Sequence, residues 1–315
     1  MIVHELRDAP PPKLAQALDQ FEEQFQYPLG PGQSFRIIHG EDYPRFFRAM
    51  GEGICFVAEK EGRVVGVIGA AVRRLTLPTG ENQSAVYFGD VKIDPTVRGG
   101  KTLLRLARAV QNWIGTEVTA AFAVVMDGTT VSPTRYTGRL GIPLFSELGK
   151  IAVLRFSTPG SKTISDEKWQ TNEEQGAACY LQLCPGKYAC PGGDSALRSE
   201  TEPVWLMEPT GRASGRLEDT RRAKRLIADD GIEMQSAHLS CFEYGDRNAG
   251  INLLQIALQI AADRKFPHLF VAVPVQETDF FIQSLKETEP VVATATVFGT
   301  GLPSGPTWNI NTAEI

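Results

Sequence analysis

A stretch in the first half of the chain constrains the fold more than any other. Residues 85–93 form an apolar, β-rich run that ends before Pro95, and two adjacent glycines follow. Apolar side chains then recur at three- and four-residue spacing over residues 103–114, as on one face of a helix. Residues 120–126 are continuously apolar, which is typical of a strand buried on both faces of a sheet. The stretch therefore predicts a strand, a turn, a helix and a second strand.

The other patterns of the first half extend this into a mixed α/β sheet. A short strand (residues 2–6) and a helix beginning near Leu14 come first. Two apolar runs flank a glycine turn and predict a hairpin, and residues 151–156 supply the last strand. The element order is β-α-α-β-β-β-α-β-α-β, an α/β order.

Part of this order recurs in the second half, where strands and helices alternate from residue 238 to residue 298. A structural duplication is the economical explanation. Residues 158–175 are polar and rich in Ser, Thr and Glu, which favours a linker. We therefore predict a domain at residues 1–157, a linker at 158–175 and a second domain at 176–315.

Composition excludes several classes of protein. The 315 residues carry a net charge of −5, so nothing favours a nucleic-acid partner, whose phosphates demand a basic face. No apolar run approaches the roughly 20 residues of a membrane helix, and the first residues lack a secretory pattern. Five cysteines in so long a chain argue against a disulfide scaffold. We expect a cytoplasmic protein without a membrane partner.

The turn between the strand and the helix has the composition of an anion site. It reads Arg98, Gly99, Gly100, Lys101, Thr102. The first helical turn offers unpaired N–H groups and a partial positive charge, and glycines let a ligand approach the backbone. A nucleotide-triphosphate loop would need a further glycine where the chain has Pro95, so we reject that alternative. The other alternative is an ordinary glycine turn with solvated charges.

The segment Ile93-Asp94-Pro95 followed by Arg98-Gly99 resembles the cofactor loop of the GNAT acyltransferase superfamily. Where the family's loop continues with further glycines, this sequence has the shorter segment Gly100-Lys101-Thr102. Thr137–Ile142 also resembles a family landmark, with its aromatic position displaced onto Tyr136. The resemblance covers about residues 1–157 and implies two GNAT-like domains in tandem. It implies acetyl-CoA as cosubstrate, with pantetheine along Val91, Lys92 and Ile93 and pyrophosphate on residues 98–102.

The reaction implied is attack of a primary amine, on a small molecule or a peptide, upon an acyl thioester. Such a reaction needs a base, a group that polarises the carbonyl and a proton donor for the thiolate. Asp90 is the candidate base or water anchor, the N–H of Val91 or Ile93 the candidate polariser, and Tyr136 the candidate donor. The alternatives are a surface carboxylate for Asp90 and a core-capping tyrosine for Tyr136.

The remaining features favour no additional site. The four histidines show no metal-ligand spacing, so we expect no metal. The basic run at residues 221–225 is interpreted as a solvated helix face. In the second half, Asp246 stands where the first half has its basic loop, so we expect this domain to be degenerate. Its expected role is a wall of the acceptor pocket or a subunit contact, with a homodimer left open.

N-acetyl transfer is the leading hypothesis. A long-chain acyltransferase and a non-catalytic CoA sensor or scaffold are the alternatives.

Overall fold

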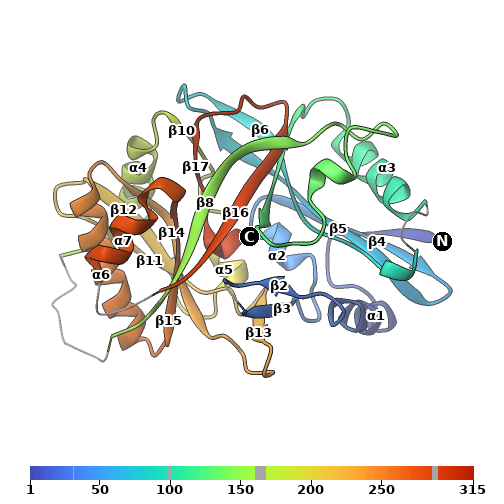
Figure 1. Cartoon of the computed structure of the whole chain (residues 1–315), viewed down its shortest axis with the longest axis horizontal. Helices are drawn as coiled ribbons and strands as arrows, with labels where there is room; N and C mark the ends of the chain where they lie inside the picture. Colours follow the sequence, from blue (N-terminus) through green and yellow to red (C-terminus); the bar gives the residue numbers. More distant parts are fainter. Residues whose placement is uncertain (31, 98–100, 160–167, 286–289) are drawn as a thin grey trace.

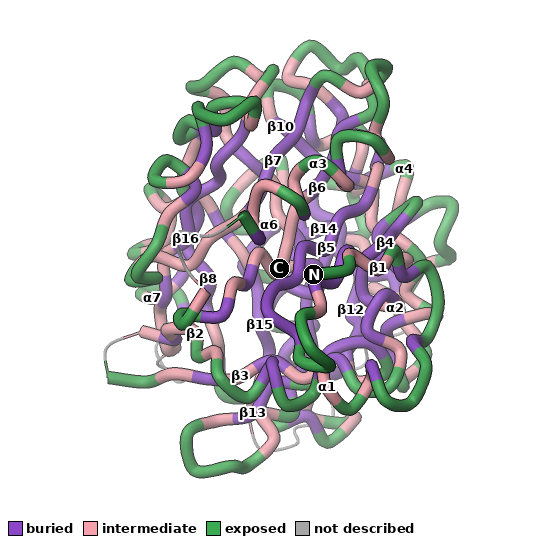
Figure 2. The backbone as a smooth tube through the Cα atoms, turned by 90° about the vertical axis from the view of Figure 1, so that its right-hand side faces the viewer, coloured by how far each residue is buried: buried purple, intermediate pink, exposed green. Residues whose placement is uncertain are grey.

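The computed structural model describes residues 1–30, 32–97, 101–159, 168–285 and 290–315. A twisted sheet of 14 strands runs across the molecule, with helices on both of its faces (Figure 1). A separate three-stranded sheet is formed by Tyr27–Pro28, Ser34–Ile38 and Arg225–Ala228. The strands are mostly buried, and exposed residues concentrate in loops and on the outer faces of helices (Figure 2). The mixed α/β architecture predicted from the sequence is therefore confirmed.

The first half supplies one side of this sheet. Its described helices and strands are β1 (Ile2–Leu6), α1 (Pro12–Glu22), β2 (Tyr27–Pro28), β3 (Ser34–Ile38), α2 (Arg45–Arg48), β4 (Glu52–Lys60), β5 (Arg63–Thr76), β6 (Asn82–Ile93), α3 (Thr102–Ile114), β7 (Ala120–Met126) and β8 (Ser146–Ser157).

The second half supplies the other side. Its described elements are β9 (Gln170–Thr171), α4 (Glu173–Leu183), β10 (Lys187–Ala189), α5 (Ser195–Arg198), β11 (Val204–Met207), β12 (Ala213–Glu218), β13 (Arg225–Ala228), β14 (Ser236–Tyr244), α6 (Arg247–Asp263), β15 (His268–Pro274), α7 (Thr278–Ser284), β16 (Val291–Thr300) and β17 (Thr307–Asn309).

The two halves exchange strands at the centre of the sheet, whose order there is β6-β7-β16-β8-β15-β14. Strand β8 follows β7 in the chain but pairs with β15, whereas β16 follows β15 and pairs with β7. The two exchanged strands also pair with each other, antiparallel. One continuous sheet therefore contains both halves (Figure 1).

The same unit occurs once on each side of the exchange. Strands β6 and β7 are parallel and are connected by α3, and strands β14 and β15 are parallel and are connected by α6. The parallel arrangement requires a crossover connection, which each helix provides. This is the repeated order that the sequence predicts.

Alternation along β4 separates two layers of the first half's core. Cys55 and Val57 pack in the cluster that contains the buried side chains of α1 and α2. Phe56 and Ala58 point to the opposite face and pack with Leu106 of α3. Successive side chains of a strand point to opposite faces, so α1 and α2 cover one face of the sheet and α3 covers the other.

Part of the predicted linker has regular structure. Strand β9 pairs with β11, and α4 begins at Glu173 with Asn172 as its N-cap. Residues 160–167 lie outside the description. The domain boundaries themselves stay a prediction. All five cysteines are buried and free, and no described helix is long and apolar enough to cross a membrane.

Candidate active site

The parallel strands β6 and β7 part from each other midway along their length. They pair over Ala85–Phe88 and Ala120–Ala123. Beyond that point β7 continues its pairing with β16 as far as Met126, while the end of β6 stays with β5. The sheet therefore opens between the last residues of β6 and of β7.

A β-bulge lies on β6 where the strands part. Gly89 is opposite Gly69 of β5 and Lys92 is opposite Val67, so Asp90 and Val91 together face a single residue of β5. Asp90 has a φ of 51°, a left-handed conformation that is unusual for any residue except glycine. A bulge leaves backbone groups without ladder partners and redirects side chains, and bulges are frequent beside active sites.

Two cavities flank this opening, one on each face of the sheet. The larger cavity, of about 440 Å³, lies against α3 and is walled mainly by apolar side chains, among them Leu103, Leu104 and Ala107. The smaller cavity, of about 170 Å³, lies on the opposite face. Four residues line both cavities: Phe88, Val91, Ala123 and Tyr136. The two cavities therefore adjoin at the bulge.

The smaller cavity is lined by aromatic and by polar side chains. Its aromatic residues come from both halves and include Phe35, Phe46 and Phe270. Its polar residues include His39, Asp90, Lys224, His238 and Thr312.

The predicted cofactor residues are described only in part. Arg98, Gly99 and Gly100 lie outside the described residues. Lys101 is exposed and precedes α3, and Thr102 begins the helix with a buried hydroxyl that has no hydrogen-bond partner among the described residues. Val91 and Ile93 are half-buried on β6. Their role in cofactor binding stays a prediction.

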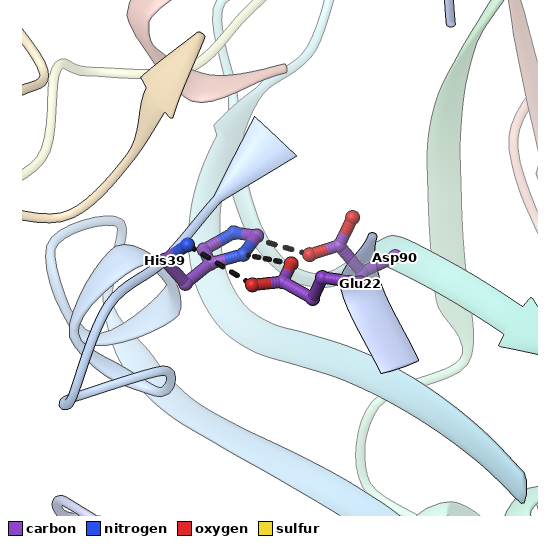
Figure 3. A group of neighbouring side chains, drawn as sticks. All are labelled: Glu22, His39 and Asp90. Carbon is purple, nitrogen blue, oxygen red and sulfur yellow. Dashed lines mark hydrogen bonds and ion pairs between the residues drawn. The ribbon is translucent and has the colours of Figure 1, made fainter. Parts of the chain in front are cut away.

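Asp90 belongs to a buried cluster that the sequence did not reveal (Figure 3). Its Oδ2 lies 3.1 Å from Nε2 of His39, whose other ring nitrogen lies 2.7 Å from Oε1 of Glu22. Glu22 ends α1 and His39 follows β3, so three segments meet here. Glu22 also accepts a hydrogen bond from the backbone N–H of His39, at 3.1 Å. The imidazole is thus fixed between two carboxylates.

Lys92 supplies the opposing charge in this cluster. Its ammonium lies 3.1 Å from Glu22 and 3.2 Å from Asp90, and Tyr43 donates a hydrogen bond to Asp90 at 3.1 Å. Burial alone would raise the pKa of both carboxyls, but Lys92 and His39 hold each pKa below its usual value. Burial likewise opposes the charge of Lys92, yet Asp90, Tyr27 and Glu22 raise its pKa. Asp90 is therefore an ionised, fully engaged carboxylate.

The geometry of Glu22, His39 and Asp90 would also allow a metal ion, since their ligand atoms lie within 4.8 Å of one another. The ammonium of Lys92 already stands between the two carboxylates, where a cation would be needed. The negative charges of the two carboxylates are therefore compensated by side chains of the protein itself.

Tyr136 follows the 3-10 helix η2 (Pro133–Arg135) and lines both cavities. Burial raises the pKa of its phenol to about 12. The hydroxyl therefore stays protonated at neutral pH and is able to donate a proton.

Nothing in the sequence singles out Lys224, and the prediction of a solvated helix face at residues 221–225 is wrong. Residues 221–225 form a turn that leads into β13, and the Lys224 side chain lines the smaller cavity with 3% of its surface exposed. Arg225, its neighbour, is exposed and pairs with Glu233. The turn and the first residue of β13, rather than a helix face, divide these cations between the cavity and solvent.

No protein-family model matches the chain, and no curated protein sequence matches it significantly. Among solved structures, it is similar to Saccharomyces cerevisiae N-myristoyltransferase with bound myristoyl-CoA, with a TM-score of 0.64 at 10% identity. That match covers 99% of this chain and 87% of the other. A second structure of the yeast enzyme with bound myristoyl-CoA gives a TM-score of 0.61 at 9% identity, covering 99% and 83%. The chain therefore has the mixed α/β fold of that enzyme.

Proposed function

We propose that this protein is an N-acyltransferase that moves an acyl group from a CoA thioester to a primary amine. The observation that carries the proposal is the opening between β6 and β7, where a bulged strand separates two adjoining cavities. A two-substrate transfer needs such an arrangement, because donor and acceptor must approach one reacting carbon from different directions.

In this proposal the donor occupies the α3 side and the acceptor occupies the smaller cavity. The thioester lies at the bulge, where the N–H of Val91 polarises its carbonyl. The amine attacks the carbonyl carbon, the C–S bond breaks, and Tyr136 donates a proton to the departing thiolate. Asp90 does not act as the base here, because its oxygens are already held by Lys92, His39 and Tyr43. It positions the bulge instead.

Acetyl-CoA is the proposed donor, and a specific observation favours a long-chain donor as the second candidate. The larger cavity offers about 440 Å³ between mainly apolar walls, which is more than an acetyl group needs. The structural neighbour was solved with myristoyl-CoA. Comparing acetyl-CoA, octanoyl-CoA and myristoyl-CoA with a panel of amines (glycine, triglycine, spermidine and phenethylamine) tests both donors. A non-catalytic CoA-binding protein would bind a donor and release no thiol.

We expect acyl-CoA to raise the melting temperature of the protein, because a ligand that binds only the folded state stabilises it. Ala107→Trp places an indole in the larger cavity and should abolish that rise. Arg105→Trp introduces the same side chain on the exposed face of α3, outside the cavity, and should leave the rise intact. Differential scanning fluorimetry measures both. Equal shifts in the two variants would contradict the donor site.

One donor molecule should bind per chain. In the second half, the carboxylate of Asp246 accepts from the N–H of Ala249 and pairs with Arg212 at 3.0 Å. A carboxylate thus already occupies the start of α6, where it would repel a pyrophosphate. Isothermal titration with acetyl-CoA should give a stoichiometry near one, and Asp246→Ala should not change it. Two donor molecules bound per chain would contradict the expectation that only the first half binds the donor.

A further inference from the structure

The smaller cavity extends from the opening between β6 and β7 toward the second half of the chain. Phe88, Val91 and Ala123 line it at the opening, where it adjoins the larger cavity. Val153 of β8 and Phe270 of β15 also line it, and both strands lie beyond β7 and β16 in the order of the sheet. An acceptor whose nitrogen lies at the opening therefore has its remaining atoms against residues of both halves.

The charged groups at the β6 side of this cavity are already paired within the protein. Asp90 lies 3.2 Å from the ammonium of Lys92 and accepts a hydrogen bond from Tyr43. Both ring nitrogens of His39 face carboxylates, those of Glu22 and of Asp90. None of these groups is left to pair with a charge on a ligand.

The polar groups from the second half are paired as well. The ammonium of Lys224 donates to an oxygen of Ile315, which belongs to the carboxylate at the end of the sequence. His238 lies 3.0 Å from the hydroxyl of Thr312, and burial lowers the pKa of its ring to about 3, so the ring is uncharged at neutral pH. Among the described residues, the walls of the smaller cavity thus offer no unpaired charge.

Most of the other walls are apolar and buried, and they include Leu29, Phe35, Ile37, Phe46, Leu226 and Phe270. The volume of the cavity is about 170 Å³. An apolar cavity of about 150 Å³ is enough to hold a benzene ring. The smaller cavity therefore has room for one aromatic ring, or for a short alkyl chain of similar volume.

We infer that the acceptor is a compact monoamine whose body is uncharged and apolar and is about as large as one aromatic ring. This inference rests on the proposed function and names the class of amine that it uses. A carboxylate, a phosphate or a second ammonium on the acceptor would be buried without a partner, which is strongly unfavourable. The polar backbone of a peptide is unsuited to these walls for the same reason.

Matched amines test the charge of the acceptor, with thiol release from the fastest donor as the assay. Phenylalanine is phenethylamine with an added carboxylate, and cadaverine is pentylamine with a second ammonium. Each charged member should have a kcat/KM at least about 100-fold below that of its uncharged counterpart, because a buried unpaired ion costs several kcal/mol. The KM for the donor should not change. A charged member that reacts as well as its counterpart, or triglycine or spermidine as the fastest acceptor, would overturn the inference.

Val153 allows a test of the size of the acceptor. It is buried, and the residues opposite it on the two neighbouring strands are Ala272 and Ala293, which leave space beside a larger side chain. Val153→Phe should lower the kcat/KM for phenethylamine, relative to that for propylamine, by at least about 10-fold. Val153→Ala should shift the preference the other way, from phenethylamine toward the larger tryptamine. A ratio of two amines does not depend on how much of a variant is folded. Unchanged ratios in both variants would contradict the inference.

A binding measurement separates the inference from the proposed function. Isothermal titration in the presence of CoA should show that phenethylamine binds, that phenylalanine and triglycine bind at least about 100-fold more weakly, and that Val153→Phe weakens phenethylamine. No binding of phenethylamine, or tighter binding of triglycine, would overturn the inference alone. Binding of phenethylamine without thiol release from any donor and amine would overturn the proposed function and leave the class of ligand in place.

Discussion

Lys92→Met is expected to lower the free energy of unfolding by about 3–5 kcal/mol, the usual cost of removing one partner from a buried ion pair. The variant would leave the carboxylates of Glu22 and Asp90 side by side without the ammonium that lies about 3 Å from each. Urea denaturation measures the change. Lys150→Met removes an exposed lysine that lies 4.0 Å from Asp127, and it should cost less than about 1 kcal/mol. A similar small loss for Lys92→Met would contradict the electrostatic account.

The pH dependence of the same variant gives an independent check. The folded-state pKa values of Glu22 and Asp90 are lowered, so the stability that they contribute is present above their unfolded values, near 4. It is lost as the pH falls through the folded values. Without Lys92 the two carboxyls are expected to stay protonated up to a higher pH. As the pH is lowered, the loss of stability should therefore begin nearer to neutral pH. Adding Asp90→Asn to Lys92→Met should recover part of the stability, because one uncompensated charge is removed.

The first half is not expected to fold by itself. A chain of residues 1–157 would lack β16, which pairs with both β7 and β8, and would leave β8 without β15. Ala295 and Val297 of β16 are fully buried, so the fragment would also expose its core. We expect it to aggregate, since unpaired apolar strand edges recruit other chains.

Size-exclusion chromatography and urea denaturation of the fragment measure this directly. Co-expression with residues 158–315 should restore a soluble complex. The full chain, cleaved within residues 158–175, should stay associated because the exchanged strands hold the pieces together. A monomeric fragment that unfolds cooperatively would show that the halves are separate domains after all.

Local patterns predicted the elements well, because they depend on neighbours in the sequence. The helical spacing over residues 103–114 and the apolar run at residues 120–126 correspond to α3 and β7. Nothing local distinguishes the partner of β16, since an apolar strand fits beside many others. The exchange of strands could therefore not be predicted from the sequence.

The site shows the same limit. Asp90 was predicted from its place beside the expected cofactor strand, but its partners Glu22 and His39 come from α1 and from the end of β3. Lys224 looked like one cation of an exposed run. Its burial depends on Phe46 of α2 and on Ile315, which are far away in sequence. The partners of Asp90 and the burial of Lys224 were both missed because they depend on contacts between segments that are far apart in the sequence.

The strand exchange sets the order in which the protein can be completed during synthesis. The hydroxyl of Thr296 on β16 donates to the carboxylate of Asp127, which directly follows β7 and lies 169 residues earlier. Until β16 leaves the ribosome, β7 has an open edge in the middle of the future sheet. Contacts over such separations give a high contact order, which slows folding. The nascent first half therefore exposes apolar surface, and the sheet around the opening between β6 and β7 can be completed only after β16 has been synthesised.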